Sequence, residues 1–599
     1  MGVIAEVKTR LIDRFLAVTG LYSRIYIYRP RSDENCTPKL CPEQTVLPVK
    51  ISVPETLSLT AQAEIENLLT SGLFSFFGRE RSIKQYQKEY QSSQPSRPWW
   101  KIDSRDYDGD PRMSWELDRH QFLPLLGWAA CYPQYEAAAQ EWIHDYLGKW
   151  FVDNPPEKGL CWASNLEVAL RAVSWCLLYW LCRPVNVQEP FWRRFRDVLY
   201  HHSVHLAKRL SHTEVCMPNN HLLGEVCALL VLAVLFGNED WKKYRRWLAR
   251  LAEEQFYTDG VNIEQSLHYH AFSLQLLLLA AFILKKIGEP FEKRTEERIR
   301  QAVCFLQWTV KPDGSWPKIG DSDDGKAFCL FESHKSVMDK AVTMAGCYIQ
   351  DIVGEKGLFQ NFAQGGFGVW RSGWTPEDSY LLVKYGPHRF HAHADLLHLE
   401  YSFGGENILI DPGTYRYNNA PALRRYFRGT AAHNTIMVDN QDQSTQFKTF
   451  RWLNCAKVRD VFCQQADALP GEIFHADLRY AQSKIRHRRS VTASRELYEF
   501  IVLDSITGAG AEAVAHFHFD PSLTVKIDGE KELVIIQTKK GKRLTVRFES
   551  PSLVEIELLE GPYSARYGEL TAHQFLRVAL NGKGEELCLK THIKTSQIN

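Results

Sequence analysis

Hydrophobic residues recur at helical spacing through the middle of the chain, from Asp118 to Gln350. Short breaks rich in Pro, Gly, Asn and Asp separate these stretches. The segments expected to be helical are Leu117–Trp150, Asn165–Leu181, Phe191–Leu210, His221–Phe236, Trp241–Glu254, Ile263–Lys286 and Thr295–Trp308. Several are apolar over most of their surface and must be buried on more than one side. Their short connections favour antiparallel neighbours, as in a bundle or an α/α toroid.

The pattern changes after Asn361, where short runs of β-branched and aromatic residues alternate with turn signals such as Gly404-Gly405. The expected strands include Ser379–Tyr385, Leu397–Phe403, Asn407–Ile410, Glu499–Asp504, Glu532–Thr538 and Arg543–Phe548. Many strands without intervening helices predict an antiparallel β-sandwich. The fold class is therefore α+β multidomain, with an N-terminal α/α toroid followed by a C-terminal antiparallel β-sandwich.

A chain of 599 residues is long enough for more than one core, because single cores stop growing near about 250–300 residues. The change of pattern near residues 350–365 predicts the main boundary. We expect a loosely organised arm over residues 1–45, the toroid domain over 46–360 and the sandwich domain over 361–599.

Composition excludes some classes of function. The net charge of +1 gives no indication of nucleic-acid binding, which usually requires a basic domain. The 14 cysteines lack the spacing of zinc fingers, and we interpret them as mostly reduced thiols. Charged residues such as Lys8, Arg10 and Arg14 interrupt any secretory signal, and the longest apolar runs are too short to span a bilayer. We therefore expect a cytoplasmic protein without a membrane span, with export by another route left open.

Two groups of polar residues interrupt the helical pattern. Asn219, Asn220 and His221 precede an apolar helix, where they are either simple helix caps or donors that project into a cleft. The segment 264–270, which contains His268 and Tyr269, opens a helix that is otherwise rich in leucine. A buried ring with a satisfied hydrogen bond is the ordinary alternative to a functional role there.

Two further groups lie in the β half. Alternation on a strand would direct His391 and His393 to one face. His393, Asp411 and His433 offer two imidazoles and one carboxylate, which suits zinc with a fourth position for water. Their wide separation in the sequence leaves open the alternative that the histidine pair has no metal-binding role.

Taken together, these segments resemble the heparinase II/III family of polysaccharide lyases, which join an α/α toroid to an antiparallel β-sandwich. The resemblance covers most of the chain and is strongest over residues 100–440. Its motifs occur in order at Trp115–Gln121, Trp162–Arg171, Asn219–His221, Ile319–Gly325, His391–Asp395, Ile410–Tyr415 and Phe427–Thr435.

The resemblance implies catalytic roles for four residues. Asn220 and His221 match the pair that contacts the substrate carboxylate and neutralises it. Tyr269 matches the catalytic tyrosine, and His391 matches the catalytic histidine of the β domain. Donors against a uronate carboxylate stabilise the charge that develops when the C5 proton leaves. Tyr269 suits the acid that protonates the departing oxygen, and His391 is the alternative base for the opposite epimer.

The resemblance also implies a metal site. His393, Asp411 and His433 match positions that hold a structural divalent metal, usually zinc, in some members. Such an ion would orient the segment that carries His391. Glu225 is similar to an acidic residue used by some relatives, although its spacing from His221 is not uniform among them.

The implied substrate is an anionic polysaccharide or oligosaccharide that contains uronic acid, such as a glycosaminoglycan or alginate. Family members that act on host polysaccharides are usually exported. We therefore expect this chain to act on oligosaccharides inside the cell or on a polymer made by the same cell, not on heparin or heparan sulfate. Two alternatives remain: a glycoside hydrolase that uses two of Glu167, Glu225 and Glu264, and a non-catalytic polysaccharide-binding or assembly protein.

Overall fold

The computed structural model describes residues 56–90, 97–102, 109–182, 189–348, 357–481, 483–508, 510, 512–529, 533–582 and 586–595. The expected N-terminal arm, residues 1–45, lies outside the described residues. The chain is divided into two compact units. Unit 1 comprises Met1–Glu254, Phe272–Glu296 and Gly325–Met344, and unit 2 comprises Gln255–Ala271, Glu297–Asp324 and Ala345–Asn599. The domain limits near 45 and 360 stay predictions.

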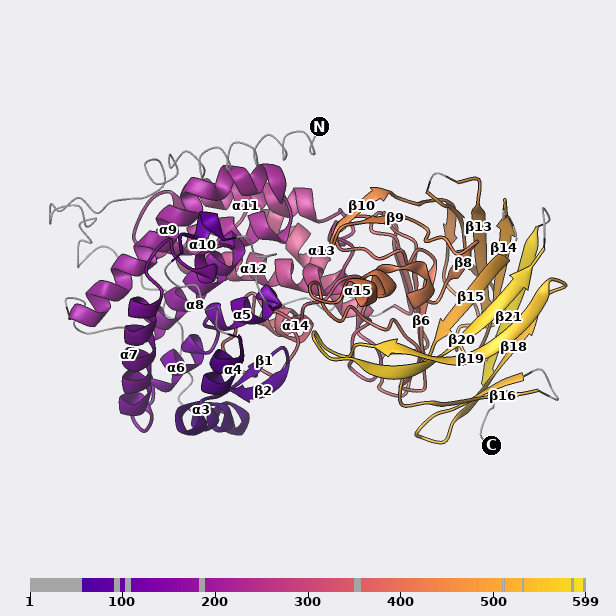
Figure 1. Ribbon diagram of the computed structural model, residues 1–599, viewed down its shortest axis with the longest axis horizontal. Coiled ribbons are helices and arrows are strands. Elements are labelled where there is room, and N and C mark those ends of the chain that lie inside the picture. The colour runs from indigo at the N-terminus through magenta and orange to yellow at the C-terminus, as the bar shows by residue number, and fades with distance from the viewer. Residues whose placement is uncertain are drawn as a thin grey trace. The chain divides into compact units, whose positions relative to one another are not determined.

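Helices make up most of the described part of unit 1 (Figure 1). Those lying wholly or mostly in it are α3 (Leu59–Ser71), α4 (Ile83–Tyr90), α5 (Pro111–Asp118), α6 (Leu123–Ala129), α7 (Glu136–Asp153), α8 (Asn165–Cys182), α9 (Pro190–Cys216), α10 (Asn220–Leu235), α11 (Trp241–Gln255), α12 (Leu267–Lys286) and α14 (Val337–Tyr348). The first turn of α12 and most of α13 (Lys293–Thr309) belong to unit 2. Short 3-10 turns occur at Trp99–Lys101, Leu160–Trp162 and Thr430–Ala432.

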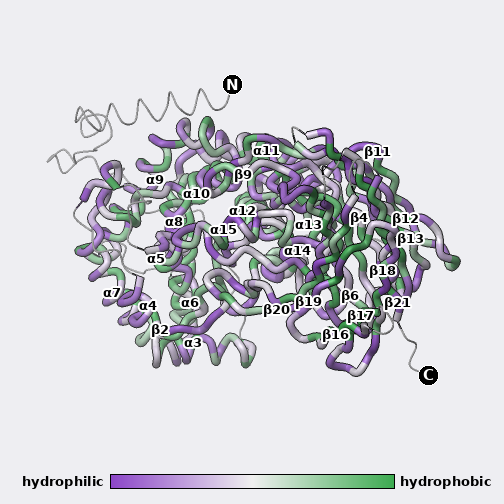
Figure 2. Tube along the Cα trace, turned by 45° about the vertical axis from the view of Figure 1, so that its right-hand side comes forward, coloured by the Kyte–Doolittle hydropathy of each residue, from purple (hydrophilic) through white to green (hydrophobic). Residues whose placement is uncertain are grey.

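The core of unit 1 forms around α8 and α10, whose apolar residues leave no solvent face. Helix α8 packs against α6, α9 and α10, and the apolar stretches appear green in Figure 2. At Gly224 a Cβ atom would lie 2.6 Å from Leu166 Cδ1, so the glycine allows α10 to approach α8 closely. The helical N-terminal fold predicted from periodicity is confirmed.

One expected helix is wrong in detail. Leu117–Trp150 is divided into the end of α5, then α6 and α7. His120 has a φ of 52°, which no helix accommodates, and a turn containing Pro133 separates α6 from α7. A hairpin that the pattern did not predict, β1 (Leu73–Phe76) with β2 (Arg79–Ser82), also lies in this unit.

Unit 2 is rich in strands, and every strand pair in its described residues is antiparallel. One sheet has five strands: β3 (Phe359–Phe362), β4 (Phe367–Arg371), β5 (Tyr380–Lys384), β6 (His398–Phe403) and β7 (Glu406–Leu409). A four-stranded sheet has the order β19 (Leu553–Tyr563), β20 (Thr571–Asn581), β15 (Glu512–His518) and β8 (Ile436–Val438).

The eight-stranded sheet has the order β11 (Lys457–Cys463), β12 (Gly471–Arg479), β13 (Arg486–Ala493), β14 (Glu499–Thr507), β21 (Leu587–Thr595), β18 (Arg543–Glu549), β17 (Leu533–Gln537) and β16 (Thr524–Asp528). A small ribbon pairs β9 (Thr445–Phe447) with β10 (Arg451–Asn454), and the short helix α15 (Pro421–Arg428) precedes it. Side chains from the three large sheets share one hydrophobic core. The expected β-sandwich is confirmed, because alternating burial on strands such as β13 reflects the two-residue period in the sequence.

Helix α12 is the one helix among the described residues that is long and apolar enough to cross a membrane. Its most apolar window is 94% buried inside the protein, as expected of a core helix. Length and apolar composition alone therefore do not indicate a membrane span.

Candidate active site

Backbone hydrogen bonds within unit 2 join three segments that are far apart in the sequence. Leu267 N donates to Ile319 O over 3.1 Å, and Asp321 N donates to His391 O over 2.9 Å. His391 N donates in turn to Glu264 O over 3.2 Å. The turn before α12, the segment after α13 and the loop between β5 and β6 therefore meet through their main chains, which fixes the side chains they carry.

Gly320 allows this close approach. Its φ is +74°, and a Cβ atom there would lie 2.6 Å from Gln265 O and 2.9 Å from His391 O. Both neighbours are backbone atoms that cannot move aside easily. Glycine alone fits where these segments cross.

Tyr269 lies in the first turn of α12. This helix begins at Leu267, not at Ile263 as the periodicity predicted, because Gln265 has a φ of 59°. Ser266 Oγ accepts from Tyr269 N over 3.1 Å and donates to Asp321 O over 2.6 Å. Ser266 thus caps the helix and ties Tyr269 to the neighbouring segment.

His391 and His393 lie in the loop 385–397 between β5 and β6, so the prediction that they share a strand is wrong. The loop is anchored by a buried ion pair in which both Asp395 oxygens lie 2.7 Å from Lys384 Nζ. Hydrogen bonds between the main chain of this loop and two other segments take the place of the hydrogen bonds that would pair a strand with its neighbours. The two histidines still converge on one point, the carboxylate of Asp321.

The rings of Tyr269 and His391 stack, with centroids 3.9 Å apart and planes inclined by 17°. The Tyr269 hydroxyl lies 2.9 Å from the Tyr417 hydroxyl. Tyr269 and His391 are 7% and 8% exposed, so both are held firmly while an edge of each still meets solvent. A tyrosine and a histidine in contact supply the acid and base that a proton-abstraction and elimination reaction needs.

Asp321 is the centre of the arrangement. One of its oxygens lies 2.9 Å from His391 Nδ1, and the other lies 3.0 Å from His393 Nε2. Arg424 binds both oxygens through its two terminal nitrogens. Burial raises the pKa of Asp321, but the charge of Arg424 and the hydrogen bonds from Arg424 and both histidines outweigh it and hold that pKa well below its usual value. Asp321 is therefore a permanent anion that orients both imidazoles.

The other nitrogen of His391 faces a second carboxylate. His391 Nε2 lies 3.4 Å from Glu264 Oε2, while Nδ1 contacts Asp321. An aspartate on one ring nitrogen sets the orientation of an imidazole and leaves the other nitrogen for proton transfer. The Arg424 guanidinium also lies 5.0 Å from the centroid of the Tyr417 ring, which places a fixed positive charge beside the pair of tyrosines.

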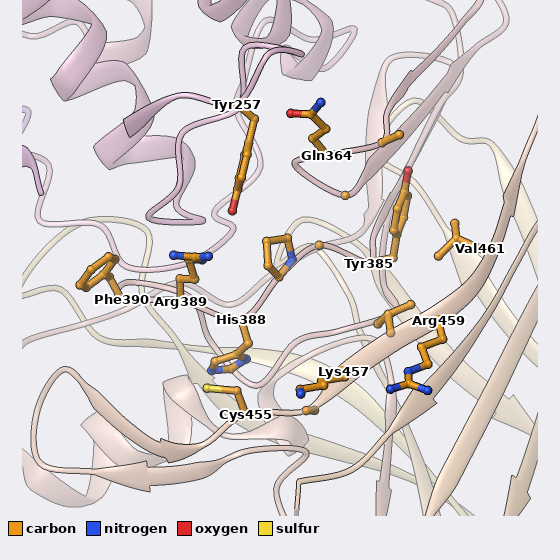
Figure 3. Close-up of a pocket in the computed structure, with 16 residues that line it drawn as sticks. Tyr257, Gln364, Tyr385, His388, Arg389, Phe390, Cys455, Lys457, Arg459 and Val461 are labelled. Atoms are coloured by element: carbon orange, nitrogen blue, oxygen red, sulfur yellow. The ribbon is translucent and has the colours of Figure 1, made fainter. Parts of the chain in front are cut away.

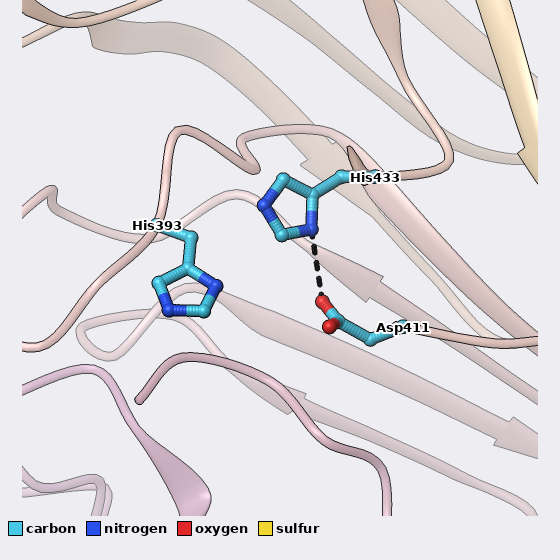
Figure 4. Close-up of side chains that lie close together, drawn as sticks. All are labelled: His393, Asp411 and His433. Atoms are coloured by element: carbon cyan, nitrogen blue, oxygen red, sulfur yellow. Dashed lines mark hydrogen bonds and ion pairs between the residues drawn. The ribbon is translucent and has the colours of Figure 1, made fainter. Parts of the chain in front are cut away.

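His393, Asp411 and His433 form a buried cluster in which one potential ligand atom from each lies within 4.8 Å of the others (Figure 4). His433 Nδ1 lies 2.9 Å from Asp411 Oδ2. Two buried nitrogens, His393 Nδ1 and His433 Nε2, have no hydrogen-bond partner among the described residues. Two imidazoles and one carboxylate with unused nitrogens fit a divalent metal ion.

Protonation states favour the same interpretation. Burial lowers the pKa of His393, which keeps the imidazole neutral as a metal ligand requires. The contact between His393 Nε2 and Asp321 is of the kind that metal-binding histidines usually make through their second nitrogen.

Asn220 and His221 lie in unit 1, at the start of α10. The capping role falls to Asn219, whose side chain accepts from His221 N over 3.2 Å. Asn220 is buried and His221 is half-buried in the first helical turn. Their joint action with Tyr269 and His391 stays a prediction.

Glu225 also lies on α10 and is buried. Its carboxyl accepts from Thr213 Oγ1 over 3.0 Å and from Asn165 Nδ2 over 3.3 Å. Burial raises the pKa of Glu225 to about 8, against which these hydrogen bonds act only in part. Glu225 is therefore a neutral, buried acid at pH 7.

The three carboxylates considered for a hydrolase, Glu167, Glu225 and Glu264, are each engaged by other side chains. Glu167 is buried and held by Arg119, with nitrogen–oxygen distances of 2.6 and 3.0 Å. In unit 2, Glu264 and Asp321 lie on either side of His391, but the low pKa of Asp321 suits neither proton donation nor exchange. A hydrolase needs one carboxyl that keeps its proton beside the glycosidic bond and a second that is free to act.

The sequence interpretation assigned no role to three members of the site: Asp321, Arg424 and Tyr417. A signal existed for two of them. Asp321 lies in the motif Ile319–Gly325, and Arg424 begins the basic stretch before His433. Nothing in the local pattern distinguished Tyr417 from a core tyrosine, because its partner Tyr269 is distant in the sequence.

Comparison with known proteins agrees with this geometry. Residues 52–340 match the family model described as heparinase II/III N-terminus, and residues 355–593 match heparinase II/III-like, C-terminal. A heparin-sulfate lyase of Bacteroides stercoris is 22% identical over 76% of this chain and 71% of its own length. One from Pedobacter heparinus is 24% identical over 77% and 70%.

Solved structures show the same fold. A crystal structure of heparinase III superposes with a TM-score of 0.70 at 18% identity, covering 97% of this chain and 91% of the other. A variant of the heparan sulfate lyase from Pedobacter heparinus gives a TM-score of 0.61 at 18% identity, covering 93% and 87%. Because both family models match and together span most of the sequence, the chain belongs to the heparinase II/III family of polysaccharide lyases.

Proposed function

We propose that the enzyme cleaves a glycosaminoglycan-type polysaccharide, or oligosaccharides derived from it, by β-elimination next to a uronic acid. The contact between Tyr269 and His391 carries this proposal, since it places an acid and a base side by side. The heparin-sulfate lyases among the similar proteins support an anionic, uronate-containing substrate.

Different residues of unit 2 are proposed to carry out the two proton transfers of the reaction. The base takes the C5 proton, the electrons of that C–H bond form the new double bond, and the C4–O bond breaks. Tyr269 is proposed to protonate the departing glycosidic oxygen, and its hydroxyl can exchange a proton with Tyr417. His391, oriented by Asp321, is the proposed base where the two events occur on opposite faces.

Asn220 and His221 are proposed to bind the uronate carboxylate. Side-chain donors there would withdraw charge from the carboxylate and stabilise the enolate-like transition state. Their place in the first turn of α10 favours contact with an anion, because the helix N-terminus carries partial positive charge.

His393, Asp411 and His433 are proposed to hold a structural zinc ion. When bound, zinc would supply a fixed positive centre that links three separate segments. His393 contacts Asp321, and Asp321 contacts His391. An ion that fixes His393 would therefore also help to fix His391, the proposed base.

An absorbance screen tests the proposal. Elimination leaves a double bond conjugated with the uronate carboxylate, which absorbs in the ultraviolet, whereas hydrolysis leaves none. The panel should include sulfated and unsulfated uronate polymers and their oligosaccharides. We expect absorbance to rise with at least one, and no rise with any would reject the proposal. Preference for a polymer extracted from the producing cells would support the finer proposal that the substrate is made by the same cell.

A further inference from the structure

A pocket of about 830 Å³ opens in unit 2 beside the loop that carries His391. Its wall comprises the segments 385–390 and 455–459, together with Val461, Tyr257 and the turn 363–366 (Figure 3). Neither Tyr269 nor His391 lines it. A volume of this size accommodates a small-molecule ligand or a short sugar segment.

Three cationic side chains line the pocket, Arg389, Lys457 and Arg459, and its lining contains no Asp or Glu. Lys457 and Arg459 are exposed and make no ion pair within 4.0 Å among the described residues. The buried His388 adds no charge, because burial lowers its pKa to about 3. The pocket therefore has a net positive charge that its own walls do not neutralise, which favours an anionic ligand.

Aromatic rings also line the pocket. Figure 3 shows the rings of Tyr257, Tyr385 and Phe390 around the pocket, with the Arg389 guanidinium near the Tyr257 hydroxyl. Burial raises the pKa of Tyr257 overall, although the charge of Arg389 acts to lower that pKa. Flat apolar faces with polar edges suit sugar rings, and a guanidinium binds carboxylate or sulfate through two parallel hydrogen bonds.

The carboxylate of Asp259, beside the turn that lines the pocket, is engaged by the main chain. Asp259 Oδ2 accepts from the main-chain nitrogens of Gln364 and Gly365, over 2.7 and 2.9 Å. It fixes the turn at the rim and lies outside the lining. The turn at the rim is thus preformed, and both main-chain donors are used by the Asp259 side chain.

The position of the pocket relates it to the active site. Arg389 and Phe390 directly precede His391 in the same loop, so the Cα atoms of Arg389 and His391 are at most about 7 Å apart. We propose that this pocket is an accessory subsite that binds a carboxylate- or sulfate-bearing sugar unit of the substrate chain, beyond the unit at which cleavage occurs. This inference rests on the proposed function and specifies where the polysaccharide chain is held.

The edge position of β11 offers a competing role for its charges. Lys457 and Arg459 lie on the outermost strand of the eight-stranded sheet, where charged side chains discourage pairing with another molecule. A role limited to edge protection predicts self-association when the charges are removed, with no change in substrate binding.

The test compares the double variant Lys457→Gln/Arg459→Gln with the matched control Lys526→Gln/Arg543→Gln. The control removes two exposed cations from β16 and β18 of the same sheet, outside the pocket. KM and kcat are measured by absorbance on polymer and on oligosaccharides of increasing length. We expect KM for the polymer to rise about tenfold, with a smaller change in kcat, and the effect to vanish for the shortest substrates.

Wild-type KM in the pocket variant would overturn the inference, and so would an equal rise in the control. Binding is measured separately by titration calorimetry with the same polymer, and light scattering reports self-association. If the wild type forms no unsaturated product from any polymer, the proposed function fails. If product forms but both variants bind polymer equally well, the subsite alone is wrong.

Discussion

The Tyr269 hydroxyl can be removed without removing the ring that stacks on His391. In Tyr269→Phe we expect normal folding and substrate binding, with a loss of rate on the order of 10²–10⁴, because the proton donor is absent. Steady-state kinetics and titration calorimetry measure these effects. Tyr498→Phe, which removes an exposed hydroxyl from the same unit, should keep full activity. Near-normal turnover by Tyr269→Phe would remove this residue from the mechanism.

Glu225 links stability to pH. Its native pKa is raised from 4.5 to about 8, so the folded protein keeps a proton there that the unfolded chain releases. Stability therefore falls as pH rises from about 4.5 to about 8, by roughly 3 kcal/mol at pH 7, and levels off above the native pKa. Glu225→Gln mimics the protonated carboxyl and should remove this dependence.

The measurement is the midpoint of thermal unfolding at several pH values. The difference between Glu225→Gln and the wild type should be small at pH 5 and grow towards pH 8. Glu141→Gln, an exposed change on α7, serves as the control. A difference that stays constant across this range would contradict a buried, protonated Glu225.

At the scale of elements, the proposed metal joins three connections of the sandwich. His393 lies between β5 and β6, Asp411 follows β7, and His433 precedes β8. Removing one ligand from such a site frees all three segments. We expect the purified wild type to contain a divalent metal, and His433→Ala to lose both the metal and several degrees in its unfolding midpoint. Elemental analysis and calorimetry measure these quantities.

His475→Ala is the matched control, because this half-buried histidine lies on β12 and is not part of the cluster. Asp321→Asn keeps its shape but weakens the contact with His393, and should lower metal affinity about 10–100-fold. Equal metal content in His433→Ala and the wild type would show that these side chains do not bind it.

Periodicity predicts a helix or strand correctly where the alternation of buried and exposed residues within the segment determines its conformation. The strand Glu499–Asp504 was expected from alternation and lies within β14 (Glu499–Thr507). The loop 385–397 was misassigned because alternating His and Ala in His391–Asp395 resembles a strand. Its conformation instead depends on the buried Lys384–Asp395 pair and on main-chain bonds to distant segments, which no local pattern contains.

At the scale of the whole molecule, the change from helical to strand periodicity and the order of the motifs were sufficient to predict the fold. The candidate side chains Tyr269 and His391 were also predictable, through the resemblance. Asp321 and Arg424 lie in or near the motifs, but their roles depend on tertiary contacts: a buried carboxylate shared between two histidines and one guanidinium. Such networks become visible only when the folded chain brings them together.

Mass spectrometry of the products from a uronate polymer decides most directly between elimination and its alternatives. Elimination breaks the C–O bond without consuming water, so the product masses sum to the mass of the substrate, and one product carries a double bond. We predict such products from the wild type, and almost none from Tyr269→Phe over the same time. Products that carry one added water for each broken bond would contradict the proposed lyase reaction.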